Sequence, residues 1–143
     1  MEPPKRLVLD TNVIVDHLRG KGDLALMSLL QEKSELATTM VNAFELFYGA
    51  HKSQKVRANL ASVKGFLSTV ELLELDEVSM EKSGKVLADL EKDGLGIDPR
   101  DLFIGCVSAS RGYALLTNNR RHLERIEGLL VVTPSDIVGT RSP

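Results

Sequence analysis

Short apolar runs alternate along this chain with longer segments of helical periodicity, and two of the runs stop abruptly at polar residues. Residues 7–9 (Leu-Val-Leu) end at Asp10, and residues 114–116 (Ala-Leu-Leu) end at Thr117. Strands that alternate with helices are typical of α/β folds, because parallel strands need a long crossover connection that is usually helical. The sequence therefore predicts an α/β fold with a largely parallel sheet.

The remaining elements follow from apolar spacing. We expect strands at 7–9, 35–38, 72–75, 114–117 and 129–132. We expect helices at 11–20, 24–30, 41–48, 60–67, 78–90 and 100–111. Thr11 and Asn12 are expected as the N-caps of the first of these helices, and Gly94 or Gly96 as the stop of the fifth. The helix at 100–111 is apolar on most sides, so deep burial is expected.

Composition limits the classes of function that remain. The chain has 143 residues, 43% apolar and 27% charged, which fits a globular domain covering residues 1–143 and excludes a disordered tail. A net charge of −2 excludes a generic polycation. The single cysteine, Cys106, is interpreted as a small core residue. No apolar run approaches the ~20 residues of a membrane span, and no secretory leader is recognised, so we expect a cytoplasmic protein without membrane contact.

The polar residues after the strands locate a candidate site. In open parallel sheets, ligands bind beyond the carboxyl ends of the strands. Two strands end in 10–12 (Asp-Thr-Asn) and 117–119 (Thr-Asn-Asn). Either set could consist only of turn and cap residues, but together they predict a polar site at one edge of the sheet.

Glu45 adds a carboxylate from a largely apolar helix. Asn42, Glu45 and Gly49 are spaced by three and four residues and therefore share one narrow helix face. Glu45 could be an ordinary surface residue of an amphipathic helix. Its large apolar neighbours Phe44 and Leu46 favour a functional role instead, and Gly49 is expected to leave open space beside the carboxylate.

The segment 98–101 (Asp-Pro-Arg-Asp) offers two further acids. Asp98 fits the N-cap of a helix with Pro99 at its first position, and that structural role accounts for it fully. Asp101 also suits the first helical turn, where a carboxylate complements the helix dipole. Leu102 and Phe103 draw that turn toward the interior, which favours a functional role for Asp101.

Several carboxylates gathered at one edge of a sheet repel each other unless protons or a cation neutralise them. Hard oxygen ligands favour Mg²⁺ or Mn²⁺ over zinc. Such a site suits the metal-assisted attack of water on a phosphodiester bond.

Four ordered segments resemble the motifs of PIN-domain ribonucleases, and most closely those of VapC-type toxins. The segments are 9–13 (Leu-Asp-Thr-Asn-Val), 45–50 (Glu-Leu-Phe-Tyr-Gly-Ala), 101–105 (Asp-Leu-Phe-Ile-Gly) and 116–119 (Leu-Thr-Asn-Asn). No single segment is diagnostic, but their order and spacing are specific. The resemblance spans about residues 7–132. It implies a three-layer fold with a central sheet of four to five strands, and Mg²⁺- or Mn²⁺-dependent cleavage of RNA.

The resemblance also assigns roles to individual residues. Asp10, Glu45 and Asp101 correspond to the acids that bind the metal. The fourth acidic position of the family falls on Asn119, which can accept a hydrogen bond but carries no charge. The neighbouring polar residues are expected to hold these ligands and their waters: Thr11, Asn12, Asp98 and Thr117.

The resemblance implies partners as well. Toxins of this type form homodimers and are held inactive by a VapB-type antitoxin, whose tail covers the active site. Apolar helices around 24–30 and 44–48 are the candidate interfaces, although either could be ordinary core. For RNA, Arg120 and Arg121 are favoured as phosphate contacts because they follow Asn119 directly. The basic residues between 51 and 70 are a second candidate.

Other functions remain open from the sequence. A PIN nuclease of RNA processing would share the same chemistry. A degenerate PIN domain that only binds a partner is a non-catalytic alternative, with Asn119 as its single sign of decay. A phosphatase with an aspartate nucleophile needs a second Asp two residues after the first, where this chain has Asn12.

Overall fold

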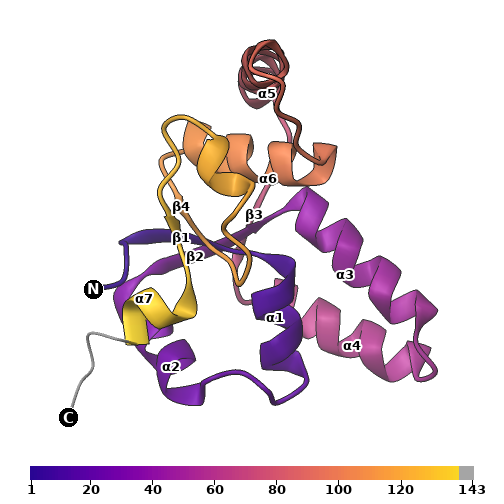
Figure 1. Ribbon diagram of the computed structural model, residues 1–143. Coiled ribbons are helices and arrows are strands. Elements are labelled where there is room, and N and C mark those ends of the chain that lie inside the picture. The colour runs from indigo at the N-terminus through magenta and orange to yellow at the C-terminus, as the bar shows by residue number, and fades with distance from the viewer. Residues whose placement is uncertain (139–143) are drawn as a thin grey trace.

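The computed structural model describes residues 1–138 and places a five-stranded sheet in its central layer (Figure 1). The strand order is β3-β2-β1-β4-β5, and every neighbouring pair is parallel, as the sequence predicts. The strands are β1 (Arg6–Leu9), β2 (Glu35–Thr39), β3 (Glu71–Leu73), β4 (Ala114–Leu116) and β5 (Val131–Val132).

The helices lie close to their predicted positions. They are α1 (Thr11–Leu18), α2 (Leu24–Lys33), α3 (Met40–Lys52), α4 (Val56–Leu67), α5 (Glu77–Lys92), α6 (Pro99–Ser110) and α7 (Pro134–Val138), with a 3₁₀ turn at Leu123–Arg125. The short helix α7 was not predicted. The last strand begins at Val131 instead of residue 129, and the third ends at Leu73 instead of residue 75.

Side chains of β1 alternate between the two faces of the sheet and feed two separate apolar cores. Leu7 and Leu9 pack in the core beneath α1, α2, α4 and α7, whereas Val8 packs in the core beneath α5 and α6. All three side chains are completely buried. Figure 1 shows the helices of these two groups on opposite sides of the strands, which confirms the three-layer arrangement.

The first helix begins differently from the expectation. Asp10, not Thr11 or Asn12, is its N-cap: the backbone of Asp10 is extended and its Oδ1 accepts from the backbone N–H of Thr11 at 2.9 Å. The reason is that Leu9 is the last strand residue, so Asp10 is already free to turn. Asp98 does cap α6, with Pro99 in the first turn, as predicted.

Two smaller expectations hold. Cys106 is fully buried in the core between α6 and the sheet. Gly94 follows α5 with a φ of +72°, a conformation that favours glycine and ends the helix. None of the helices within residues 1–138 has the length and apolar character that crossing a bilayer requires.

Candidate active site

The three acids that the sequence predicts as a group line one open cleft. The cleft lies where the carboxyl end of β1 meets the starts of α1 and α6 and the first half of α3, elements that gather at one end of the sheet in Figure 1. Its lining residues are Asp10, Thr11, Asn12, Val15, Asp16, Glu45 and Asp101. The position of this cleft therefore agrees with the strand-end rule.

Three neighbouring groups fix the carboxylate of Asp10, which is buried. Its Oδ1 accepts from the Thr11 backbone and from Asn42 Nδ2 at 3.0 Å, and its Oδ2 accepts from Thr117 Oγ1 at 2.7 Å. Asn42 and Thr117 are completely buried. Because hydrogen bonds to a charged acceptor are strong, this set holds the carboxylate in one orientation.

A second set of hydrogen bonds connects this carboxylate to Glu45. Asn42 Nδ2 also donates to Thr11 Oγ1 at 2.9 Å, and Thr11 Oγ1 donates to Glu45 Oε1 at 2.6 Å. The Oδ1 atom of Asn42 accepts from the backbone N–H and the hydroxyl of Thr39, so every polar atom of this side chain has a partner. Asn42 is thus the centre of the network that links Asp10 to Glu45.

The open space predicted beside Glu45 is present. A β-carbon built at Gly49 meets nothing within 4 Å. Gly49 and Glu45 also border a groove between α1, α3 and α4, where Leu46 and Val63 contribute apolar walls. The cleft therefore continues along α3 as a partly apolar groove.

The start of α6 contributes Asp101 and an arginine. Burial, reinforced by the negative charges of Asp10, Asp98 and Glu45, raises the pKa of Asp101. Arg100 faces the same acids, with Nη1 at 3.7 Å from Glu45 Oε2 and Nε at 3.4 Å from Asp98 Oδ1. The backbone and side chain of Arg100 lower the pKa of Asp98, which caps the helix.

The donor chemistry of the cleft suits a hard divalent cation. Asp10, Glu45 and Asp101 bring only carboxylate oxygens to the cleft, and burial together with the nearby negative charges raises the pKa of Asp101. As placed, however, no three His, Cys, Asp or Glu side chains within residues 1–138 stand close enough to enclose a metal ion. The acids share one cleft without yet forming a closed set of ligands.

The segment after β4 borders the site in a different way from that expected. Thr117 holds Asp10, as expected, and its Oγ1 also accepts from the backbone N–H of Asn119 at 3.1 Å. Asn119 itself is exposed and does not line the cleft. Its neighbour Asn118 connects this segment to α1. The backbone N–H of Asn118 donates to Asn12 Oδ1 at 3.2 Å, and its Nδ2 donates to Asp16 Oδ2 at 3.1 Å.

The two arginines expected to contact RNA differ in their surroundings. Arg120 forms an ion pair with Asp136 of α7, donates to Thr133 Oγ1 at 3.4 Å and lies 3.5 Å from Glu124 Oε1. These contacts hold it against the C-terminal helix, so its position does not favour the expected phosphate contact. Arg121 is exposed, and its role in RNA binding stays a prediction.

Sequence reasoning did not identify three residues that line the cleft or contact its acids: Asn42, Asp16 and Arg100. A usable signal existed for the first two. Asn42 shares a helix face with Glu45, and Asp16 lies one helical turn after Asn12. Arg100 stands between two acids in the sequence, but its approach to Glu45 depends on how α6 meets α3, which local spacing does not reveal.

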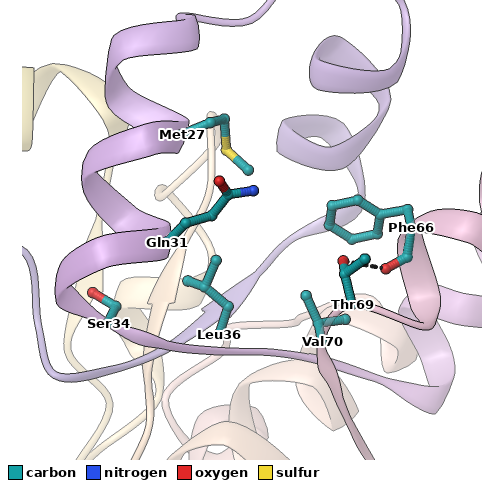
Figure 2. Close-up of a pocket in the computed structure, with 7 residues that line it drawn as sticks. All are labelled: Met27, Gln31, Ser34, Leu36, Phe66, Thr69 and Val70. Atoms are coloured by element: carbon teal, nitrogen blue, oxygen red, sulfur yellow. Dashed lines mark hydrogen bonds between the residues drawn. The ribbon is translucent and has the colours of Figure 1, made fainter.

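A second hollow, between α2, β2 and the segment before β3, lacks such chemistry (Figure 2). Its walls are neutral side chains, among them Met27, Leu36, Phe66 and Val70, and the hydroxyl of Thr69 donates to the carbonyl of Phe66 at 2.6 Å. Leu36 lies near the amino end of β2, away from the strand ends that carry the acids. The acidic cleft is therefore the candidate active site.

Comparison with known proteins identifies the family of the chain. The family model described as PIN domain matches residues 7–129. The chain is 32% identical over 124 residues to a protein of Shigella flexneri named tRNA(fMet)-specific endonuclease VapC, a match that covers 87% of this chain and 94% of the relative.

Solved structures give the same result. The structure described as DNA-bound VapBC from Salmonella typhimurium aligns with a TM-score of 0.82 and 31% identity, covering 92% of this chain and 99% of that one. VapBC2 from Rickettsia felis bound to a promoter DNA fragment aligns with a TM-score of 0.83 and 28% identity, covering 90% of this chain and 98% of that one. The chain belongs to the PIN-domain family and, within it, to the VapC-type ribonucleases.

Proposed function

We propose that this chain is a Mg²⁺- or Mn²⁺-dependent endoribonuclease and the toxin of a VapBC-type toxin–antitoxin pair. The observation that carries the proposal is the convergence of Asp10, Glu45 and Asp101 on one cleft, at the positions that the family resemblance assigns to metal ligands. Membership of the VapC-type ribonucleases supports the nuclease activity. The all-oxygen donor set supports the choice of metal.

In this mechanism the three carboxylates would hold the divalent ion. When bound, the ion would supply the charge that lowers the pKa of a water molecule and offsets negative charge on the phosphate. Asn42 and Thr117 keep the Asp10 carboxylate in its orientation, and Thr11 does the same for Glu45. The expected products carry 5′-phosphate and 3′-hydroxyl ends.

The substrate to test first is initiator tRNA. Two relatives, from Shigella flexneri and Salmonella typhimurium, are named tRNA(fMet)-specific endonucleases and are each 32% identical to this chain. We propose that this chain also cuts a tRNA. Mapping RNA ends after brief expression in cells, with the wild type beside Asp10→Asn, identifies the RNA without assuming this choice.

The decisive experiment compares purified wild type, Asp10→Asn and Glu45→Gln on the tRNA(fMet) transcript with Mg²⁺, Mn²⁺ or EDTA. We expect cleavage by the wild type with either metal, and loss of cleavage with EDTA or in both variants. Glu81→Gln, an exposed acid on α5, is the control and keeps full activity. Full activity of Asp10→Asn, or cleavage that EDTA leaves undiminished, would refute the mechanism.

The antitoxin is expected to bind over the same cleft. The Salmonella and Rickettsia structures are VapBC complexes, which supports a VapB-type partner for this chain. We propose that the antitoxin tail lies in the groove beside Gly49 and places a basic residue against the carboxylates. Co-purification with the product of an adjacent small gene, and loss of inhibition when its tail is removed, test this assignment. The same result separates a toxin from a PIN nuclease of RNA processing.

A homodimer is proposed through α3. The predicted interface on α2 is mostly core, because Leu26, Met27 and Leu30 are buried. By contrast, Phe44 and Tyr48 are exposed and stack on each other with ring centroids 6.2 Å apart. We expect Tyr48→Glu to shift the protein from dimer to monomer in light scattering, and an unchanged mass would exclude this face.

A further inference from the structure

Arg100 is placed at the mouth of the acidic cleft. Among the residues that the structure describes, it is the only lysine or arginine that forms an ion pair with an acid of this site. Its guanidinium reaches Glu45 on one side and Asp98 on the other, at 3.7 Å and 3.4 Å. The positive charge therefore lies directly beside the carboxylates that are to act on RNA.

The cleft needs such a charge when RNA enters. Asp10, Asp16, Glu45 and Asp101 line it, and each RNA phosphate brings a further negative charge. Arg120 is held by Asp136 and Thr133 near α7 and is poorly placed to meet a phosphate in the cleft. Arg100, which already contacts two of the acids, is the nearest cation that can bind a phosphate of the RNA strand.

The present contacts of Arg100 are easily exchanged. The pair with Glu45 is 3.7 Å long, and 55% of the Arg100 side chain is exposed. Ion pairs of this kind contribute little stability, so water and salt compete with them effectively. A phosphate group is a better partner, because the planar guanidinium can bind two of its oxygens at once.

We propose that Arg100 leaves Glu45 when RNA enters and binds a phosphate of the strand to be cut. This inference rests on the proposed function and deepens it by naming a substrate-binding residue. The exchange removes one positive contact from the Oε2 atom of Glu45 and places that charge on the substrate. Asp98 remains beside the arginine throughout and limits how far its side chain can move.

The test uses Arg100→Ala and Arg100→Lys, measured on the tRNA(fMet) transcript at several salt concentrations. Both variants keep the backbone N–H of residue 100, which donates to Asp98 Oδ1, so the helix cap is retained. Lys85→Ala is the control: Lys85 is an exposed cation on α5 that pairs with Asp89 at 2.8 Å and is not part of the cleft. Thermal unfolding checks that all variants are folded.

We expect Arg100→Ala to raise KM about tenfold with little change in kcat, because a phosphate contact present before and during reaction changes mainly binding. The slope of log KM against log salt concentration should shrink by ~0.7, which is the effect of one lost contact to a single strand. Arg100→Lys should keep the salt slope and recover part of KM. Lys85→Ala should match the wild type.

Unchanged KM and salt slope in Arg100→Ala would overturn the inference. A lower KM, or a lower Mg²⁺ requirement, would also overturn it, since Arg100 would then restrain Glu45 instead of serving RNA. The affinity of the same RNA for Asp10→Asn, with and without Arg100→Ala, is measured by fluorescence anisotropy and does not depend on cleavage. If the wild type cuts no RNA, the proposed nuclease function fails, while this binding comparison still decides the role of Arg100.

Discussion

The buried amide of Asn42 gives the sharpest test of how the site is held together. Asn42→Asp keeps the shape of the side chain and replaces the N–H₂ group that faces Asp10 Oδ1 at 3.0 Å with a carboxylate oxygen. The oxygen that accepts from Thr39 can remain in place. The substitution therefore changes only the two contacts of Nδ2, those to Asp10 Oδ1 and to Thr11 Oγ1.

The size of the effect follows from the contact. A hydrogen bond to a charged group is worth about 1.5–3 kcal/mol. Two like charges about 4 Å apart repel by about 4 kcal/mol at an effective dielectric constant of about 20. Protonation of one carboxyl sets an upper limit on the loss of unfolding free energy. Keeping a carboxyl protonated costs about 1.36 kcal/mol for each pH unit above the ordinary Asp pKa of about 3.9. The expected loss of unfolding free energy is about 4–5 kcal/mol at about pH 7.5, falling to about 1.5 kcal/mol at about pH 5.

The sign of this pH dependence follows from linkage. In the variant, the pair of carboxyls binds a proton more readily when folded than when unfolded, so the folded pKa is raised. The difference in unfolding free energy between the variant and the wild type therefore shrinks as the pH falls and grows as the pH rises. Urea unfolding of both proteins in EDTA, at a series of pH values, measures the difference.

Asn59→Asp is the matched control, since Asn59 is exposed and donates only to Ser53 Oγ at 2.8 Å among the described residues. Its stability should remain within about 0.5 kcal/mol of the wild type. If Asn42→Asp is as stable as the wild type at neutral pH, or if its deficit does not vary with pH, Asn42 does not hold Asp10 in the way described here.

Three further outcomes are expected. Asp101→Asn should stabilise the fold in EDTA. Because burial and neighbouring acids raise the pKa of Asp101, the wild type loses stability as the pH rises above 3.8, and the stability advantage of the variant in urea unfolding should grow from pH 4 to pH 7. A variant that is no more stable than the wild type at pH 7 contradicts this. Gly105→Ala should destabilise the fold by about 1–3 kcal/mol, because its β-carbon would overlap Ile126 Cδ1 and lie 3.2 Å from Leu129 Cδ2. An unchanged melting temperature would show that the core repacks freely. Gly49→Ala, with open space around its β-carbon, should instead stabilise α3 by up to about 1 kcal/mol, which a lower melting temperature would exclude.

The positions of the acids could be predicted because each leaves a local trace in the sequence. Asp10 and Thr117 interrupt apolar strands, and a parallel sheet brings such strand ends together. Glu45 shares a helix face with Asn42 in the sequence, and the structure turns that face toward Asp10. For these residues, periodicity and strand ends are sufficient to indicate the site.

Contacts between segments that are distant in the chain could not be predicted from local sequence patterns. Arg120 follows the site directly in the chain, yet Asp136, sixteen residues later, draws it toward α7. That helix has only five residues, too few for periodicity to reveal. Asp10 and Thr11 are both good N-cap residues, and only the exact end of β1 decides between them. Sequence patterns specify elements and their faces, whereas the packing of one element on another selects the partners of long side chains.

The central place of β1 in the sheet has a consequence for the order in which the site can form during synthesis. Asp10 is made early, but its neighbours in the sheet and in its hydrogen bonds come late: β1 pairs with β4, and Thr117 donates to the Asp10 carboxylate. A chain still being synthesised therefore cannot complete this constellation before Thr117 has been made. Until then the Asp10 carboxylate lacks one of its three hydrogen-bond donors, and the site of the proposed ribonuclease activity is incomplete.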